Sequence, residues 1–259
     1  LIGPLFYAFC LGANQLFSVL IPDKTVSDIV VKVFLILSTV GLGLLVKKRL
    51  GKEFILGMTT NNLGKCLLLG WHPLAGAALN LFKNMNLDFQ TVIATLPLTL
   101  LTALNPGITE EILFRGIVSN NMMRVMKSRK NGIYLALIIP AVFFGITHIC
   151  NIFLVGVQPH YLWQGAYATA IGLVFGAMYL RTRNLLGCII LHTLFDFCEF
   201  AFRYTSSSTA LLTSEMQSAV YIIMLLFIVV VGTAVAFFMV RKSRHAEILA
   251  NWEVGETEV

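Results

Sequence analysis

The sequence has few charged residues for its length. Of its 259 residues, 12% are charged and 57% are hydrophobic, whereas soluble domains average about 25% and 45–50%. This composition excludes an ordinary water-soluble domain and indicates a polytopic membrane protein. The formal net charge of +6 does not indicate nucleic-acid binding, because most basic residues form short clusters between apolar segments, as topology signals do.

Several motifs are missing as well. The sequence has no C-x-x-C pair, no H-E-x-x-H run of the kind that marks zinc peptidases, and no repeat of 20–50 residues. Residues 3–21 lack a basic n-region and a small-residue cleavage site, so we expect a membrane span there rather than a signal peptide. We interpret the five cysteines as small buried hydrophobes.

Long apolar runs fill most of the chain. Because a helix needs about 20 apolar residues to cross roughly 30 Å of hydrocarbon, we predict about eight transmembrane helices. They are expected near residues 3–21, 28–46, 63–82, 88–105, 133–150, 161–180, 185–203 and 218–240. The predicted fold class is an all-α polytopic membrane helix bundle, with residues 1–259 forming one membrane-embedded domain.

The basic clusters support this count. Every even-numbered span is followed by a cluster of two to four basic residues. The odd-numbered spans are each followed by one basic residue at most. Under the positive-inside rule both termini are then cytoplasmic. In span six, Gly172 and Gly176 form a G-x-x-x-G pair, which we expect to support helix packing within the monomer.

An ionisable run at residues 109–116, T-E-E-I-L-F-R-G, stands out against this apolar background. An ionisable side chain at a membrane helix centre costs roughly 2.5–3.5 kcal/mol, so such groups are taken as functional by default. Glu111 and Arg115 are four residues apart and can form a salt bridge on one helix face. Glu110 is rotated by about 100°, which leaves it free to act as a base.

The residues Asn105-Pro106-Gly107 precede this run. Asn as an N-cap with Pro at the first helical position is a standard helix start. The sequence therefore predicts that a new helix begins here and carries the carboxylates in its first two turns.

Two further motifs lie on later apolar segments. Phe144 precedes His148 by one helical turn, and His192 shares a face with Asp196 four residues later. Glu199 follows on a similar face, and we interpret it as a bystander in the same cavity. Polar groups on three separate apolar segments are costly unless they converge on a wet pocket.

Two chemistries fit such a pocket. In the first, Glu110 and His148 activate a water that attacks a peptide carbonyl, while His192 and Asp196 stabilise the oxyanion. In the second, the same groups bind a divalent metal, such as zinc, that activates the water. The missing H-E-x-x-H motif favours the metal-free version, so no cofactor is expected.

The ordered trio E-E-x-x-x-R, F-x-x-x-H and H-x-x-x-D resembles the CPBP family, the CAAX protease and bacteriocin-processing family, also called Abi or type II CAAX endopeptidases. The resemblance covers a motif core of about residues 90–203. It implies an eight-helix intramembrane peptidase in which Glu110 is the catalytic glutamate and His148 its partner in activating water. His192 and Asp196 match the oxyanion pair, Asp196 standing where eukaryotic members often have Asn. An ionised Asp196 can only accept hydrogen bonds, so it would need to be protonated to stabilise an oxyanion. Otherwise its role would be to orient His192.

The resemblance also implies a substrate and a location. We expect a membrane-associated peptide or protein substrate in the lipid bilayer, and a multi-pass protein of a bacterial plasma membrane. Processing of a peptide pheromone or bacteriocin leader, or bacteriocin immunity, would suit a bacterial member. Two alternatives stay open: a proton-coupled transporter, against which the single helix break counts, and a catalytically silent scaffold on the same fold.

Counting along the predicted spans raises a difficulty. At 1.5 Å per residue, His192 lies about 10 Å and His148 about 20 Å from the cytoplasmic ends of their spans. Glu110 falls close to the cytoplasmic edge. The three residues meet only if span boundaries shift, helices tilt, or the helix of Glu110 folds back into the bilayer.

Overall fold

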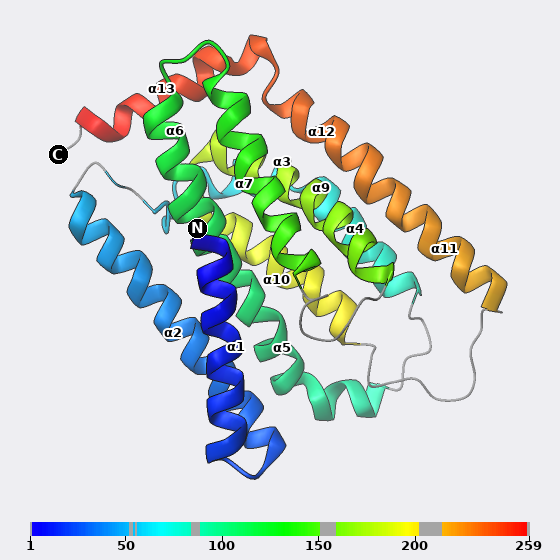
Figure 1. Cartoon of the computed structure of the whole chain (residues 1–259). Coiled ribbons are helices and arrows are strands. Elements are labelled where there is room, and N and C mark those ends of the chain that lie inside the picture. Colours follow the sequence, from blue (N-terminus) through cyan, green and yellow to red (C-terminus); the bar gives the residue numbers. More distant parts are fainter. Residues whose placement is uncertain are drawn as a thin grey trace.

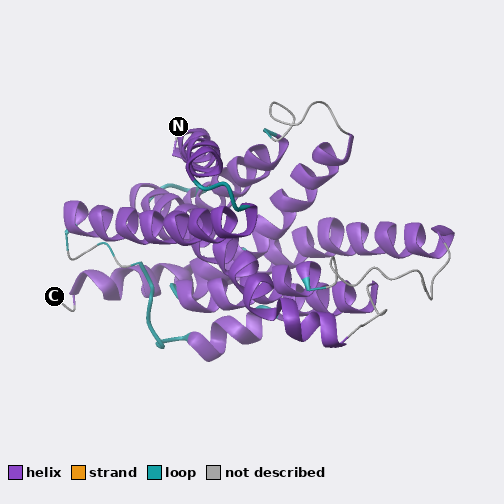
Figure 2. Cartoon of the chain, turned by 90° about the horizontal axis from the view of Figure 1, so that it is seen from below, coloured by secondary structure: helices purple, strands orange, loops and turns teal. Residues whose placement is uncertain are grey.

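The computed structural model describes residues 2–51, 54, 56–83, 89–150, 159–201 and 214–257, and every regular element in them is helical (Figures 1 and 2). The helices are α1 Ile2–Leu20, α2 Lys24–Leu50, α3 Leu63–Leu69, α4 Trp71–Lys83, α5 Phe89–Glu111, η1 Ile112–Ser119, α6 Asn120–Met126, α7 Gly132–Ile149, α9 Pro159–Thr182, α10 Leu185–Phe200, α11 Ser214–Leu226, η2 Phe227–Val231, α12 Gly232–Met239, η3 Lys242–Arg244 and α13 His245–Thr257. The all-α class is thereby confirmed.

Four helical stretches in the described residues are long and apolar enough to cross a membrane. They are α2, the continuous stretch Gln90–Met126, α7 and the stretch Tyr221–Met239. The other predicted spans coincide with α1, α9, α10 and the pair α3–α4, which is interrupted at Gly70. Helix α10 has only 16 residues and, like α9, lies largely inside the bundle. The count of eight spans and the orientation of the termini stay predictions.

The predicted helix start at Asn105-Pro106-Gly107 is wrong. Helix α5 passes through Pro97 and Pro106 without ending and continues through the π-helical segment η1 into α6. A proline removes one backbone donor, and membrane helices tolerate this because neighbouring side chains and helices satisfy the freed groups. The carbonyl that Pro106 leaves without its helical donor is that of Thr102, four residues earlier; the Thr109 hydroxyl bonds separately to the Asn105 carbonyl, at 2.7 Å.

Glycines bring α7 and α9 into close contact. A β-carbon added at Gly172 would lie 3.1 Å from the Phe144 ring, and one at Gly176 would lie 3.0 Å from Leu137. Both neighbours belong to α7. The G-x-x-x-G pair thus packs helices within the monomer, as predicted.

The turn between α9 and α10 is buried rather than exposed at a membrane surface. Asn184 is fully buried; its side chain donates to the carbonyls of Thr59 and Asn61 at 2.7 Å each and accepts from the Gly187 amide at 2.6 Å, capping α10. Helix α13 lies across the same end of the bundle, at the top of Figure 1, where Trp252 Nε1 donates to the Leu180 carbonyl. The start of α10 is therefore recessed beneath other segments.

Candidate active site

Glu110 and His148 lie at the same height along two antiparallel helices. A tight turn over residues 127–131 joins α6 to α7, and Glu110 precedes Met126 by as many residues as His148 follows Gly132, sixteen in each case. Both side chains are therefore about 24 Å from that turn along their helices. The count that put Glu110 near the cytoplasmic edge assumed a helix that begins at Asn105, whereas the helix of Glu110 extends on both sides of Asn105; the depth of Glu110 in the membrane stays a prediction.

A close approach of backbones brings α10 to the same place. A β-carbon added at Gly107 would lie 2.2 Å from Thr193 Oγ1 and 3.1 Å from the Thr193 backbone nitrogen, so only glycine lets α5 and α10 touch here. Glu110 and Glu111 follow Gly107 by one turn, and His192 precedes Thr193. The N-P-G sequence thus marks a contact between α5 and α10.

Glu111 links Arg115 and His192 in the interior. Its Oε1 atom accepts from Arg115 NH1 at 2.8 Å and from His192 Nδ1 at 2.7 Å. Glu111 is fully buried and Arg115 is 2% exposed. The predicted salt bridge at i,i+4 spacing is present, with a histidine added to it, and Arg115 NH2 also donates to the Gly172 carbonyl at 3.2 Å.

Two phenylalanines enclose this network. The Arg115 guanidinium carbon lies 5.0 Å from the ring centroid of Phe144 and 5.5 Å from that of Phe175. The Phe175 ring also stacks on His192 at 5.2 Å with a 17° angle between the planes. These contacts fix the guanidinium and the imidazole in low-dielectric surroundings, where their hydrogen bonds to Glu111 are strong.

A cavity of about 540 Å³ opens on the other side of His192. It is lined by Glu110, Phe144, His148, His192 and Asp196, which are five of the seven predicted site residues. The remaining two, Glu111 and Arg115, lie behind this wall. The structure therefore separates the two glutamates as the helical spacing predicts, with Glu110 facing the cavity and its side chain 25% exposed.

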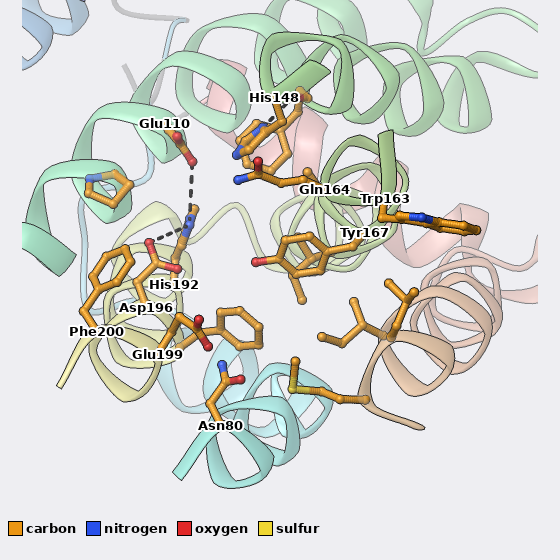
Figure 3. A pocket seen from close by; sticks show the side chains of 18 of the residues that line it. Asn80, Glu110, His148, Trp163, Gln164, Tyr167, His192, Asp196, Glu199 and Phe200 are labelled. Atoms are coloured by element: carbon orange, nitrogen blue, oxygen red, sulfur yellow. Dashed lines mark hydrogen bonds and ion pairs between the residues drawn. The ribbon is translucent and has the colours of Figure 1, made fainter. Parts of the chain in front are cut away.

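His148 faces the cavity with one nitrogen occupied. Its Nδ1 donates to the Phe144 carbonyl at 3.0 Å, and its ring meets the Phe144 ring edge-on at 4.7 Å. In a neutral imidazole this bond fixes the proton on Nδ1 and leaves the Nε2 lone pair to accept one. Figure 3 shows His148 and Glu110 at the same end of the cavity.

Carboxylates surround His192. Its Nε2 lies 3.7 Å from Glu110 Oε2 and 3.6 Å from Asp196 Oδ2 (Figure 3). Its Nδ1 is bonded to Glu111. Because both ring nitrogens face carboxylate oxygens, this arrangement suits a doubly protonated imidazolium. Nε2–H would then point into the cavity.

The contribution of α9 to the cavity was not predicted from the sequence. Phe175 supports His192, and further cavity residues lie on the same side of this helix: Tyr161, Gln164, Ala168 and Ile171. Their separations of three and four residues are a helical-face pattern visible in the sequence. This spacing can be read from the sequence, but it is the same for a helix face that lines a cavity and for one that packs against another helix.

A metal site was the second chemical possibility. In the described part of the chain, no group of three or more His, Cys, Asp or Glu side chains is arranged to hold a metal ion. His192 has its Nδ1 on Glu111 and its Nε2 between two carboxylates that lie beyond 3.5 Å. The choice between the two mechanisms is left to the chelator experiment below.

Comparison with protein families gives one match. Residues 92–198 match the family model described as type II CAAX prenyl endopeptidase Rce1-like. The matched segment begins in α5 and ends in α10, so it contains every residue predicted for the site. Neither the curated proteins nor the solved structures gave a match.

Proposed function

Because residues 92–198 form an Rce1-like domain of the type II CAAX endopeptidases, a branch of the CPBP family, we propose that this protein is an intramembrane endopeptidase of the glutamate type. The observation that carries the proposal is the convergence of Glu110, His148 and His192 on one cavity, from three helices. Three of the four helical stretches that are long and apolar enough to span a bilayer contribute residues to this cavity, which supports a membrane-associated peptide or protein as the substrate.

Glu110 and His148 activate the water in this proposal. Glu110 takes a proton from a water molecule, the resulting hydroxide attacks the carbonyl carbon, and a tetrahedral oxyanion forms. His148 Nε2 bonds to the same water and orients it. When the C–N bond breaks, the proton held by Glu110 passes to the leaving amine, and both residues return to their starting states.

His192 stabilises the oxyanion. Nε2–H of its imidazolium points to the cavity side, where charge develops during the attack. Glu111 holds the ring through Nδ1, and Arg115 neutralises Glu111 from behind. Asp196 then acts by keeping His192 protonated and oriented rather than by donating to the oxyanion itself, since an ionised carboxylate has no proton to donate.

For the biological substrate we propose a peptide pheromone or bacteriocin leader, or a membrane-protein segment, cleaved in a bacterial plasma membrane. The support is the family-level endopeptidase assignment together with a cavity inside a membrane bundle.

The test is cleavage of fluorescence-quenched apolar peptides by the purified full chain in nanodiscs. The wild type should cleave, whereas Glu110→Ala and His148→Ala should each lose at least about 100-fold in rate, as expected when a general base is removed. Glu253→Ala, at an exposed position of α13, is the matched control and should cleave normally.

The same assay separates the alternatives. Cleavage that survives in Glu110→Ala would refute the glutamate mechanism. Loss of activity with a chelator and recovery with added Zn²⁺ would establish the metal-dependent variant instead. An unchanged cellular phenotype in cells that express Glu110→Ala would favour the silent scaffold.

A further inference from the structure

Two buried cysteines from different helices meet near the start of α10. Cys66 of α3 and Cys188 of α10 are fully buried free thiols, and their Sγ atoms lie 4.0 Å apart. The two residues are 122 positions apart in the sequence, so only the fold brings them together. The mechanism proposed above uses neither of them.

The backbones of α3 and α10 are close enough here for a disulfide. A β-carbon added at Gly187, next to Cys188, would lie 2.9 Å from the Cys66 β-carbon, so the glycine lets the helices touch. Bonded sulfurs lie about 2.05 Å apart, which leaves about 2 Å to close by rotating the two side chains and shifting α3 slightly. Helix α3 suits such a shift, because it has seven residues and is bounded by Asn62, with a φ of 59°, and by Gly70.

Both thiols have only weak hydrogen bonds to lose. Cys66 Sγ donates to the Asn184 carbonyl at 3.7 Å, and Cys188 Sγ donates to the Phe175 carbonyl at 3.8 Å; a thiol is a weak donor. The product disulfide is uncharged and therefore suits a buried position. Cys66 also follows Lys65, whose side chain is 38% exposed, so a small uncharged oxidant has only a short way to travel from the surface.

Cys188 connects this pair to the candidate active site. It lies one helical turn before His192 on α10, and the carbonyl to which it donates belongs to Phe175, whose ring stacks on His192. When the Cys188 sulfur moves towards α3, it leaves that carbonyl and pulls on the turn of α10 that precedes His192.

We propose that Cys66 and Cys188 form a redox site that hydrogen peroxide closes into a disulfide, and that closing it displaces His192 and slows cleavage. The thiolate of one cysteine attacks a peroxide oxygen: an S–O bond forms, the O–O bond breaks, and the departing hydroxide takes up the thiol proton as water. The second sulfur then attacks the sulfenic acid: the S–S bond forms, the S–O bond breaks, and a second water leaves with the second thiol proton. The two sulfurs lose two electrons, which the peroxide gains. The effect on cleavage rests on the proposed function, whereas the disulfide does not.

Peptide mass spectrometry tests the disulfide. The purified full chain in nanodiscs is treated with hydrogen peroxide, its remaining thiols are alkylated, and it is digested. The wild type should give a cross-linked peptide pair containing Cys66 and Cys188, which dithiothreitol separates. Cys198→Ala, which removes another buried cysteine of α10, should give the same pair. Full alkylation of both cysteines after peroxide, or sulfinic and sulfonic acids without a cross-link, overturns the proposal.

Cleavage of the fluorescence-quenched peptides tests the link to His192. Peroxide should lower kcat/KM of the wild type about threefold or more, because a misplaced oxyanion donor costs rate steeply, and dithiothreitol should restore it. Cys66→Ala has the same methionines but no second thiol, so it should keep its rate in peroxide. An equal loss in Cys66→Ala, or an unchanged rate in a cross-linked wild type, refutes the link.

A readout without turnover separates this proposal from the proposed function. In protein labelled with ¹⁵N-histidine, the His192 signal, assigned by its absence in His192→Gln, should move on oxidation of the wild type and stay in place in Cys66→Ala. That result supports the redox site even if no peptide is ever cleaved. A His192 signal unchanged in the cross-linked wild type refutes the displacement even if the protein proves to be a peptidase.

Discussion

Glu111 has an unusual position for a carboxylate in a membrane protein, because one of its oxygens accepts from both a guanidinium and an imidazole. Arg115 and His192 come from different helices, and both contact the Phe175 ring from a third. Each of these groups is costly to bury alone, and each is compensated by another. Glu111, Arg115 and His192 therefore depend on one another, and we expect that replacing one of them disturbs the other two.

Removing Arg115 tests this coupling. Arg115→Gln leaves the Glu111 carboxylate buried with only His192 as a charged partner, which should cost about 3 kcal/mol of unfolding free energy. The expected result is a clear drop in the midpoint of thermal unfolding of the detergent-solubilised protein, together with loss of cleavage.

The double variant Glu111→Gln/Arg115→Met is the control. It removes both charges, so it should recover part of the lost stability. Activity should stay low, because His192 has lost the carboxylate on its Nδ1. If the double variant unfolds as early as Arg115→Gln, the buried charge is not the cause of the destabilisation.

At the level of helices, spacing within one helix was predictable and contacts between helices were not. The Glu111–Arg115 pair follows from four-residue spacing alone. The Phe175–His192 stack depends on α9 and α10 folding back from a buried turn at Asn184. No local sequence pattern predicts that this turn is buried. The N-P-G sequence was misread because its local propensities favour a helix start, whereas the packing of Gly107 on Thr193 keeps α5 continuous.

The close contact between α7 and α9 offers a test at this scale. A β-carbon added at Gly145 would lie 1.9 Å from Thr169 Oγ1 and 2.6 Å from the Gly165 carbonyl oxygen. Gly145→Ala should therefore push α7 away from α9 and displace His148, one turn later. We expect a loss of cleavage of about tenfold or more and a loss of about 1–3 kcal/mol in stability.

Gly41→Ala is the matched control. Gly41 lies in α2 with nothing within 4 Å of an added β-carbon, and alanine is the better helix former. This variant should retain full activity and stability. If Gly145→Ala and Gly41→Ala behave alike, the α7–α9 contact does not set the position of His148.

Across the whole molecule, the C-terminal helix ties distant segments together at one end. Glu247 of α13 accepts from Lys65 of α3 and from Arg181 of α9 at 2.8 Å each, and pairs with Arg244 at 3.1 Å. The hydrogen bonds from Lys65 and Arg181 lower the pKa of the Glu247 carboxyl from 4.5 to about 2. Folding is thereby linked to the protonation of one side chain outside the predicted spans.

The sign of the pH effect follows from this depressed pKa. The stabilisation is fully present above about pH 4.5 and is lost as the pH falls towards the folded-state value of about 2. Glu247 is partly exposed, so the effect should be of order 1 kcal/mol. We expect wild type to unfold at a higher temperature than Glu247→Gln at pH 7, and the difference to shrink by pH 3.

Glu253→Gln again provides the comparison, since Glu253 is exposed on the same helix. It should unfold like the wild type at both pH values. A gap between wild type and Glu247→Gln that stays constant from pH 7 to pH 3 would contradict the linkage.

The continuous helix Gln90–Met126 has 37 residues and is therefore about 55 Å long, much more than the roughly 30 Å of a bilayer's hydrocarbon core. Such a helix must tilt or project from the membrane, and the balance depends on how thick the surrounding lipid is. Glu110 is fixed on this helix about 24 Å from one end. In the proposed mechanism, lipid thickness would thus set how far below the headgroups a scissile bond must lie to reach Glu110, and a thinner or thicker membrane would select different bonds in the same substrate.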